Sequence, residues 1–186
     1  MTLLVRAGDL IGRPVVTLDT AEDVAEVKDV VFRHAEATVV GFTLNKRGRF
    51  AGPLKEVLPW SRVAALGRDA VMIESRDALG PPDEPMGAAS GGSDQNIIGT
   101  TVMTEAGKAL GTVRDLVLEV GRDADVVGFE ITDGGHGRLL PVDDTFSVSR
   151  EALMVPAAAE EFIHDDISGF GSAVGAFRER LRRQDG

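Results

Sequence analysis

A strand phrase that occurs twice constrains the fold of this chain more than any other feature of the sequence. Its second copy occupies residues 113–118 and, after a short gap, 126–131; its first copy occupies residues 27–32 and 39–44. Shorter blocks repeat on both sides, at an offset of 87 positions near the start of each copy and 82 near the end. The offset changes between apolar runs, where loops tolerate insertions and paired strands do not. The repeat therefore indicates a duplicated fold, and 186 residues suffice for two small domains.

Each copy predicts short β-strands separated by turn residues, with no helical period of useful length. In the second copy the polar residues 121–125 predict a tight loop, so the strands on either side should form an antiparallel hairpin. Alternation along this hairpin puts Val127, Phe129 and Ile131 on one face. We expect that face to be buried and the opposite face to be exposed to solvent. Five or six such strands in roughly 70 residues are typical of a small, partly open barrel.

The repeat also sets the expected domain boundaries. The stretch between the copies is rich in Pro, then in Gly, Ser and Ala, which is typical of a linker. Barrels this small bury little surface alone, so we expect the two to share an interface or to bind another chain. The predicted fold class is mainly all-β, with a first partly open barrel at residues 1–79, a linker at 80–95, a second barrel at 96–157 and a C-terminal segment with an amphipathic helix at 158–186.

Apolar residues recur at spacings of three and four after the second barrel, which is the period of an amphipathic helix. Because glycines weaken the first half of this stripe, the sequence predicts a helix from about Ser172 to Arg183, with Ser172 as its N-cap. We expect the helix to pack on a barrel. Pairing with a second copy of the chain or with a partner helix is the next alternative, and binding to an anionic membrane surface is the weakest. The stripe consists of Ile163, Ile167, Phe170, Val174, Phe177 and Leu181.

Composition narrows the classes of function. The chain has no cysteine, which excludes disulfide bonds and thiolate metal sites and makes a cytoplasmic location the default expectation. Its net charge of −10 argues against nucleic-acid binding through the acidic body, although four arginines lie among the last nine residues. We expect no secretory signal and no transmembrane segment, since the required apolar runs are missing.

The second copy is similar to the PRC-barrel family at residues 107–116 (GKALGTVRDL), 127–129 and 140–142. That family is named for a cytoplasmic domain of the photosynthetic reaction centre. It also forms the C-terminal domain of the bacterial ribosome-maturation factor. Because the family has no common active site, the resemblance implies a docking module and transfers no catalytic residue.

The first copy resembles the same family at residues 27–30, 40–42 and 58–61. It departs at residues 20–26, where an acidic run replaces the two glycines of the family's turn. Together the two copies carry the resemblance over roughly residues 8–157.

Titratable residues do not converge on a predicted catalytic or metal site. The three histidines lie on separate segments, and the sequence His-Asp-Asp at residues 164–166 is typical of a solvated polar stretch. Asp143 and Asp144 are interpreted as surface carboxylates. Asp29 and Asp115 occupy the same repeat position, and we expect each to accept hydrogen bonds from a neighbouring turn; a shared binding determinant is the alternative. We predict no catalytic residue, no metal and no cofactor.

Three features are candidates for partner binding. Trp60, the only tryptophan, follows a predicted bend at Pro59 and would be an interface anchor if exposed, or core if buried. Its counterpart is Val142, so the two barrels do not present equivalent surfaces. The first copy alone carries an insertion, Arg47 to Lys55, which predicts a basic, mobile loop with an apolar tip. Recognition loops often look like this, although ordinary loop drift also explains it. With the helix stripe, the candidates are Trp60, Arg47, Arg49, Phe50, Lys55, Phe177 and Leu181.

The leading hypothesis is a cytoplasmic bacterial protein that is not an enzyme and acts as a protein-interaction or adaptor module. Its partner is an unknown protein, with self-association as one form. An alternative is an accessory protein of RNA processing or ribosome assembly with a ribosomal component as partner, motivated by the family relative and the arginine-rich end. A second alternative is a small-molecule-binding regulatory protein.

Overall fold

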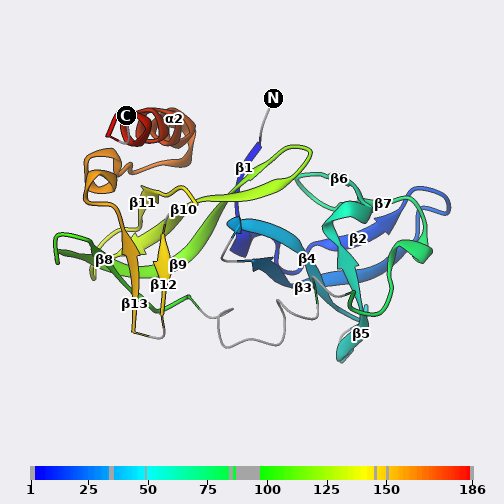
Figure 1. The fold of residues 1–186 in the computed structure, drawn as a ribbon. Helices are drawn as coiled ribbons and strands as arrows, with labels where there is room; N and C mark the ends of the chain where they lie inside the picture. The colour runs from blue at the N-terminus through cyan, green and yellow to red at the C-terminus, as the bar shows by residue number, and fades with distance from the viewer. Residues whose placement is uncertain are drawn as a thin grey trace. The chain divides into compact units, whose positions relative to one another are not determined.

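The structure is a computed structural model that describes residues 3–33, 36–48, 50–83, 86, 97–144, 146–149 and 151–184. The chain forms two compact units (Figure 1). The first-repeat unit consists of Asp9–Arg33 and Val39–Gln95. The second-repeat unit consists of Met1–Gly8, His34–Thr38 and Asn96–Gly186. Each unit holds one copy of the repeated strand phrase, so each is described by itself.

The described strands of the first-repeat unit are β2 (Pro14–Thr17), β3 (Asp23–Arg33), β4 (Thr38–Asn45, of which Val39 onward belongs here), β5 (Pro53–Pro59), β6 (Val63–Leu66) and β7 (Val71–Ile73). Their order is β4-β3-β2-β7-β6, and β5 pairs with β4. β2 pairs parallel with β7 and antiparallel with β3. Alternating apolar residues along β3 bury Ala25, Val27 and Val31 in the core.

The described strands of the second-repeat unit are β1 (Leu3–Arg6), β8 (Thr101–Thr104), β9 (Ala109–Val120), β10 (Ala124–Thr132), β11 (Arg138–Pro141), β12 (Ser147–Val148) and β13 (Ala152–Val155). The order β12-β13-β8-β9-β10, with β11 on β10, reproduces the order of the first-repeat unit, including one parallel pair between β8 and β13. The order runs between two end strands, so the sheet is not closed. The predicted duplication and the mainly β fold with a C-terminal helix are confirmed.

Strand β1 lies at the start of the chain but pairs antiparallel with β9 of the second copy, from Leu3 opposite Val120 to Arg6 opposite Val117. The side chain of Arg6 forms an ion pair with Glu130 on β10, which leaves the Glu130 side chain only 12% exposed. The second-repeat unit is therefore built from segments at both ends of the sequence. Most of the predicted linker, residues 84, 85 and 87–95, lies outside the described residues.

The β9–β10 hairpin is antiparallel as predicted, but a bulge changes which side chains face the core. The register shifts between Val126 and Gly128, so Val127 is the extra residue. Val127 therefore packs with Val117 under the C-terminal helix, away from Phe129. The prediction that Val127 shares the face of Phe129 is wrong. The expectation that the opposite face is exposed to solvent is also wrong, because the C-terminal helix covers that face.

Helix α2 (Ile167–Gln184) packs on the second-repeat unit, as expected. Its buried residues Phe170 and Val174 contact Val117, Val127 and Leu139. A 3-10 helix, Ala157–Phe162, leads into it.

The helix begins before the predicted start, and the prediction of Ser172 as its N-cap is wrong. The carboxylate of Asp166 caps it, because Oδ1 accepts the backbone N–H groups of Ser168 at 2.9 Å and Gly169 at 3.2 Å. Gly169 does not break the helix. A Cβ at this position would lie 2.6 Å from Nε2 of His164, so a larger residue would require the imidazole ring to shift.

Candidate functional site

The loop that joins β4 to β5 presents an exposed aromatic ring. We call residues 46–52 the Phe50 loop. Backbone hydrogen bonds close it, with the Lys46 N–H donating to the Gly52 carbonyl at 3.0 Å and the Ala51 N–H donating to the Gly48 carbonyl at 3.1 Å. Phe50 itself is 97% exposed, far more than any other exposed large hydrophobic residue in the part of the chain that the structure describes. The candidate Arg49 lies outside the described residues.

Arg47 anchors the base of the Phe50 loop to strand β3. Its guanidinium forms ion pairs with Asp23 at 2.6 Å and with Glu26 at 2.9 Å. Both carboxylates belong to the acidic run in which the first copy departs from the repeat pattern, and Arg47 belongs to the insertion that only the first copy carries. The insertion and the acidic run, the two segments in which the first copy differs from the second, therefore contact each other. We interpret them as one structural feature.

Of the other first-repeat candidates, Lys55 lies on β5 and Trp60 begins the 3-10 helix Trp60–Arg62 that follows it. Lys55 is exposed on β5, close to the Phe50 loop in the sequence. Trp60 is half-buried and packs against the buried ring of Phe42, with ring centroids 5.9 Å apart. Because β5 separates Trp60 from the Phe50 loop by seven residues, the two ends lie on the order of 20 Å apart. Trp60 and Phe50 do not form one contact surface.

The two helix candidates lie in the second-repeat unit and differ in exposure. Phe177 is fully buried and packs against Phe162, with ring centroids 5.7 Å apart. Leu181 is half-buried and lines a cavity. Of this pair, only Leu181 presents surface to a ligand.

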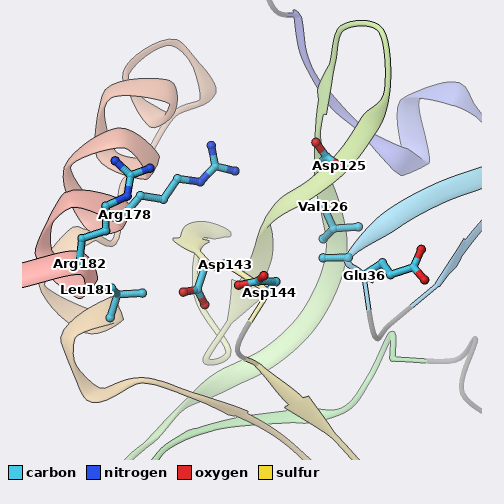
Figure 2. Close-up of a pocket in the computed structure, with 9 residues that line it drawn as sticks. Glu36, Asp125, Val126, Asp143, Asp144, Arg178, Leu181 and Arg182 are labelled. Carbon is cyan, nitrogen blue, oxygen red and sulfur yellow. The ribbon is translucent and has the colours of Figure 1, made fainter. Parts of the chain in front are cut away.

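That cavity has a volume of about 470 Å³ and opens between α2 and the β9–β10 hairpin (Figure 2). Figure 2 shows Arg178 and Arg182 projecting from the helix, with Asp143 and Asp144 between the helix and the hairpin. Asp125 and Glu36 lie on the side away from the helix. The lining residues are Glu36, Ala37, Asp125, Val126, Asp143, Asp144, Arg178, Leu181 and Arg182.

Hydrogen bonds and an ion pair hold the walls of the cavity. The Val126 N–H donates to the Ala37 carbonyl at 2.6 Å, and the Thr38 hydroxyl donates to Oδ1 of Asp125 at 3.1 Å. On the helix side, Arg178 lies 3.5 Å from the carboxylate of Glu119 on β9. These contacts fix segments that are distant in sequence, so the cavity is largely formed without a ligand.

The sequence does not predict this cavity. From the sequence alone, Asp143 and Asp144 are interpreted as surface carboxylates, and the last residues indicate only an arginine-rich end. The cavity joins four separate stretches of chain, which no local pattern reveals. The available signal was the spacing of Arg178, Leu181 and Arg182, which places all three on one helix face.

Asp166, His136 and His164 do not line the cavity. The pKa of Asp166 lies below its ordinary value because its carboxylate accepts hydrogen bonds from the Ser168 hydroxyl and from the backbone of Gly169 and Ser168, with a smaller contribution from His164. His136 is exposed in a turn, and His164 pairs its backbone with Leu139. In the described part of the chain, no three histidine or acidic residues are placed to hold a metal ion.

The expectation for Asp115 is confirmed, since its carboxylate accepts the backbone N–H of Gly8 at 3.1 Å. The residue equivalent to Gly8 in the other copy, at the offset of 87, is residue 95, which lies outside the described residues. Asp29 itself is exposed. The two aspartates therefore differ in environment although their sequence positions match.

Comparison with known families identifies a match to the PRC-barrel domain, once over residues 4–79 and again over 92–162. These ranges cover more than half of the chain. No curated protein matches the sequence. Among the helices that the structure describes, none combines the length and the apolar character needed to cross a membrane.

Proposed function

The chain belongs to the PRC-barrel family, as a tandem pair of domains of a non-catalytic type, and from this premise we propose that it is an interaction module that binds another protein through the Phe50 loop. The observation that carries the proposal is the 97% exposure of Phe50 on a loop whose base is anchored. Aromatic rings are enriched at protein–protein interfaces, where they fill apolar pockets of the partner.

The energetics favour an apolar pocket on the partner. Full burial of a phenylalanine side chain contributes about 1.5–3 kcal/mol relative to its exposed state. Because Arg47 fixes the loop through two ion pairs, less conformational entropy is lost on binding than for a free loop. The loop is thus suited to inserting one ring into a matching pocket.

Positive charges near Phe50 favour a partner with an acidic surface. Lys46, the first residue of the Phe50 loop, and Lys55, three residues after the loop, are both exposed. Exposed cations around an apolar anchor steer association toward a surface of opposite sign. The proposed partner therefore carries an apolar pocket with an acidic rim, and we place the interaction in the cytoplasm, where a domain without cysteines needs no oxidising environment.

Affinity capture from the native host tests the proposal. The full chain, Phe50→Ala and Leu18→Ala serve as baits; Leu18 is a matched control because it is 53% exposed in the same unit. We expect a protein that wild type and Leu18→Ala retain equally and that Phe50→Ala retains about tenfold less. Equal retention of every captured protein by all three baits would contradict the proposal.

A second candidate function, RNA or ribosome-assembly work, rests on the exposed Arg180 and Arg183 near the end of α2. Their neighbours Arg178 and Arg182 face carboxylates in the cavity, which would repel phosphate groups. RNA binding that weakens with added salt and is lost in an Arg180→Gln/Arg183→Gln double variant would support this function. No RNA binding at low salt would exclude it.

A further inference from the structure

The cavity between α2 and the β9–β10 hairpin has walls of opposite charge. Four carboxylates line it, from Glu36, Asp125, Asp143 and Asp144, together with two guanidinium groups. Glu36 and Asp143 also have interaction partners, so the carboxylates of Asp125 and Asp144 are the ones that we match to a ligand. A ligand that matches this lining carries a cationic group and also one anionic group.

The helix wall offers one guanidinium for that anionic group. Arg178 already has a carboxylate neighbour, Glu119, at 3.5 Å. Arg182 lies one turn further along the same face and is exposed at the mouth of the cavity. Guanidinium groups bind carboxylates through two parallel hydrogen bonds, so Arg182 is suited to hold a ligand carboxylate.

Apolar side chains lie between the two charged walls. Leu181 projects from the helix beside the two arginines, and Val126 lies on the hairpin side (Figure 2). Ala37 also lines the cavity. A methylene chain that spans from the arginines to the carboxylates would pack against these groups. The cavity volume of about 470 Å³ lies within the range of small-molecule sites.

We propose that this cavity binds a basic amino-acid group that carries a free carboxylate. The carboxylate lies on Arg182, the aliphatic stem on Leu181 and Val126, and the side-chain cation near Asp144 and its neighbours. This chemistry occurs in a free basic amino acid and in the C-terminal residue of a peptide that ends in arginine. The site is separate from the Phe50 loop, so it stands or falls independently of the proposed partner.

Calorimetric titration of the full chain tests the ligand chemistry with matched compounds. L-Arginine and agmatine share the guanidinium and the stem, but agmatine lacks the carboxylate. We expect L-arginine to bind with a Kd of about 1 mM or tighter and agmatine to bind about tenfold more weakly. Binding of agmatine as tight as that of L-arginine, or no binding of L-arginine at about 10 mM, would overturn the proposal.

Peptides distinguish the two sources of the group. If a peptide end is the ligand, Gly-Gly-Arg binds more tightly than L-arginine, and its C-terminal amide loses that affinity. If a free amino acid is the ligand, L-arginine binds more tightly than Gly-Gly-Arg. Equal binding of Gly-Gly-Arg and its amide, together with equal binding of L-arginine and agmatine, would contradict both forms.

Charge-removing variants assign the contacts. Arg182→Gln is expected to weaken L-arginine binding about tenfold, while its neighbour Arg183→Gln, which does not line the cavity, leaves it unchanged. Asp144→Asn is expected to weaken binding, while Glu151→Gln, an exposed carboxylate outside the cavity, does not. Unaltered melting curves confirm that these surface variants fold. Equal affinity of Arg182→Gln and Arg183→Gln would show that any binding occurs elsewhere.

Discussion

The backbone N–H of Gly8 donates to both carboxylate oxygens of Asp115, each at 3.1 Å. Oδ1 of Asp115 also accepts the N–H of Leu116 at 2.7 Å. These bonds fasten the end of β1 to β9, although 107 positions of sequence separate the two residues. One half-buried carboxylate thus connects the start of the chain to the second copy of the repeat.

Replacement of Asp115 by alanine is expected to lower the free energy of unfolding by about 0.5–1.5 kcal/mol, because the backbone N–H groups of Gly8 and Leu116 lose their acceptor. Asp29→Ala is the matched control at the same repeat position. Because Asp29 is exposed, its loss should change stability by less than about 0.5 kcal/mol. Urea denaturation of both variants checks the prediction, and similar losses in the two would argue against it.

Gly128 permits the contact between β10 and the C-terminal helix. A Cβ at this position would lie 2.7 Å from Cε1 of Phe170 and 2.7 Å from the carbonyl oxygen of Leu140. Gly128→Ala should therefore destabilise the protein by about 1–3 kcal/mol through overpacking.

Gly175 on the exposed side of α2 provides the opposite case, because a Cβ there would meet nothing within 4 Å. Gly175→Ala should stabilise the protein by about 0.5–1 kcal/mol through helix propensity. Thermal melts of the two variants should shift in opposite directions. A shift of the same sign in both would contradict the close packing of Phe170 on Gly128.

The cap formed by Asp166 predicts a dependence of helix stability on pH. The folded pKa of Asp166 is lowered from 3.8, mainly by the hydrogen bond from Ser168. A depressed carboxyl pKa stabilises the fold above the unfolded pKa, and this contribution is lost as the pH falls below 3.8 through the folded value. The stability difference between wild type and Asp166→Ala should shrink over that range in denaturation curves. A difference that stays constant would refute the role of the charge.

Replacement of Arg47 should affect partner binding more than the stability of the protein. Its ion pairs with Asp23 and Glu26 involve partly exposed side chains, so water screens them and Arg47→Ala should cost less than about 1 kcal/mol of stability. The same change frees the base of the Phe50 loop and should weaken partner binding. Arg68→Ala, which removes an exposed pair with Asp69 in the same unit, is the control. If both variants bind the partner as wild type does, the anchor has no part in recognition.

The sequence alone predicts much of the strand arrangement. It predicts less well the bulge in β10, the start of the C-terminal helix and the cavity. The repeat correctly indicates two copies of one strand order because apolar strands and polar turns are local signals. The bulge at Val127 is not predictable in this way, since one extra residue leaves no mark in the alternation yet reverses the face of the side chain. The helix start is missed because Gly169 resembles a breaker until its contact with His164 is seen.

Pairings between distant segments are also beyond local patterns. Nothing in residues 3–6 indicates that their partner is β9 in place of a nearer strand. The cavity that contains Asp125, Asp144 and Arg182 depends on the same long-range assembly. The Phe50 loop was predicted as a candidate because an insertion unique to one copy is visible in the repeat itself, but its pairing with the acidic run of β3 required the structure.

The most direct test of the proposed function is site-specific photo-crosslinking in the native host. A benzophenone-bearing phenylalanine analogue replaces Phe50 in one strain and Leu18 in another, and covalent adducts are separated by size after irradiation. We expect a discrete adduct with one protein from position 50 and none of that size from position 18. Adducts that are missing at position 50, or identical from both positions, would contradict the claim that the Phe50 loop binds a partner.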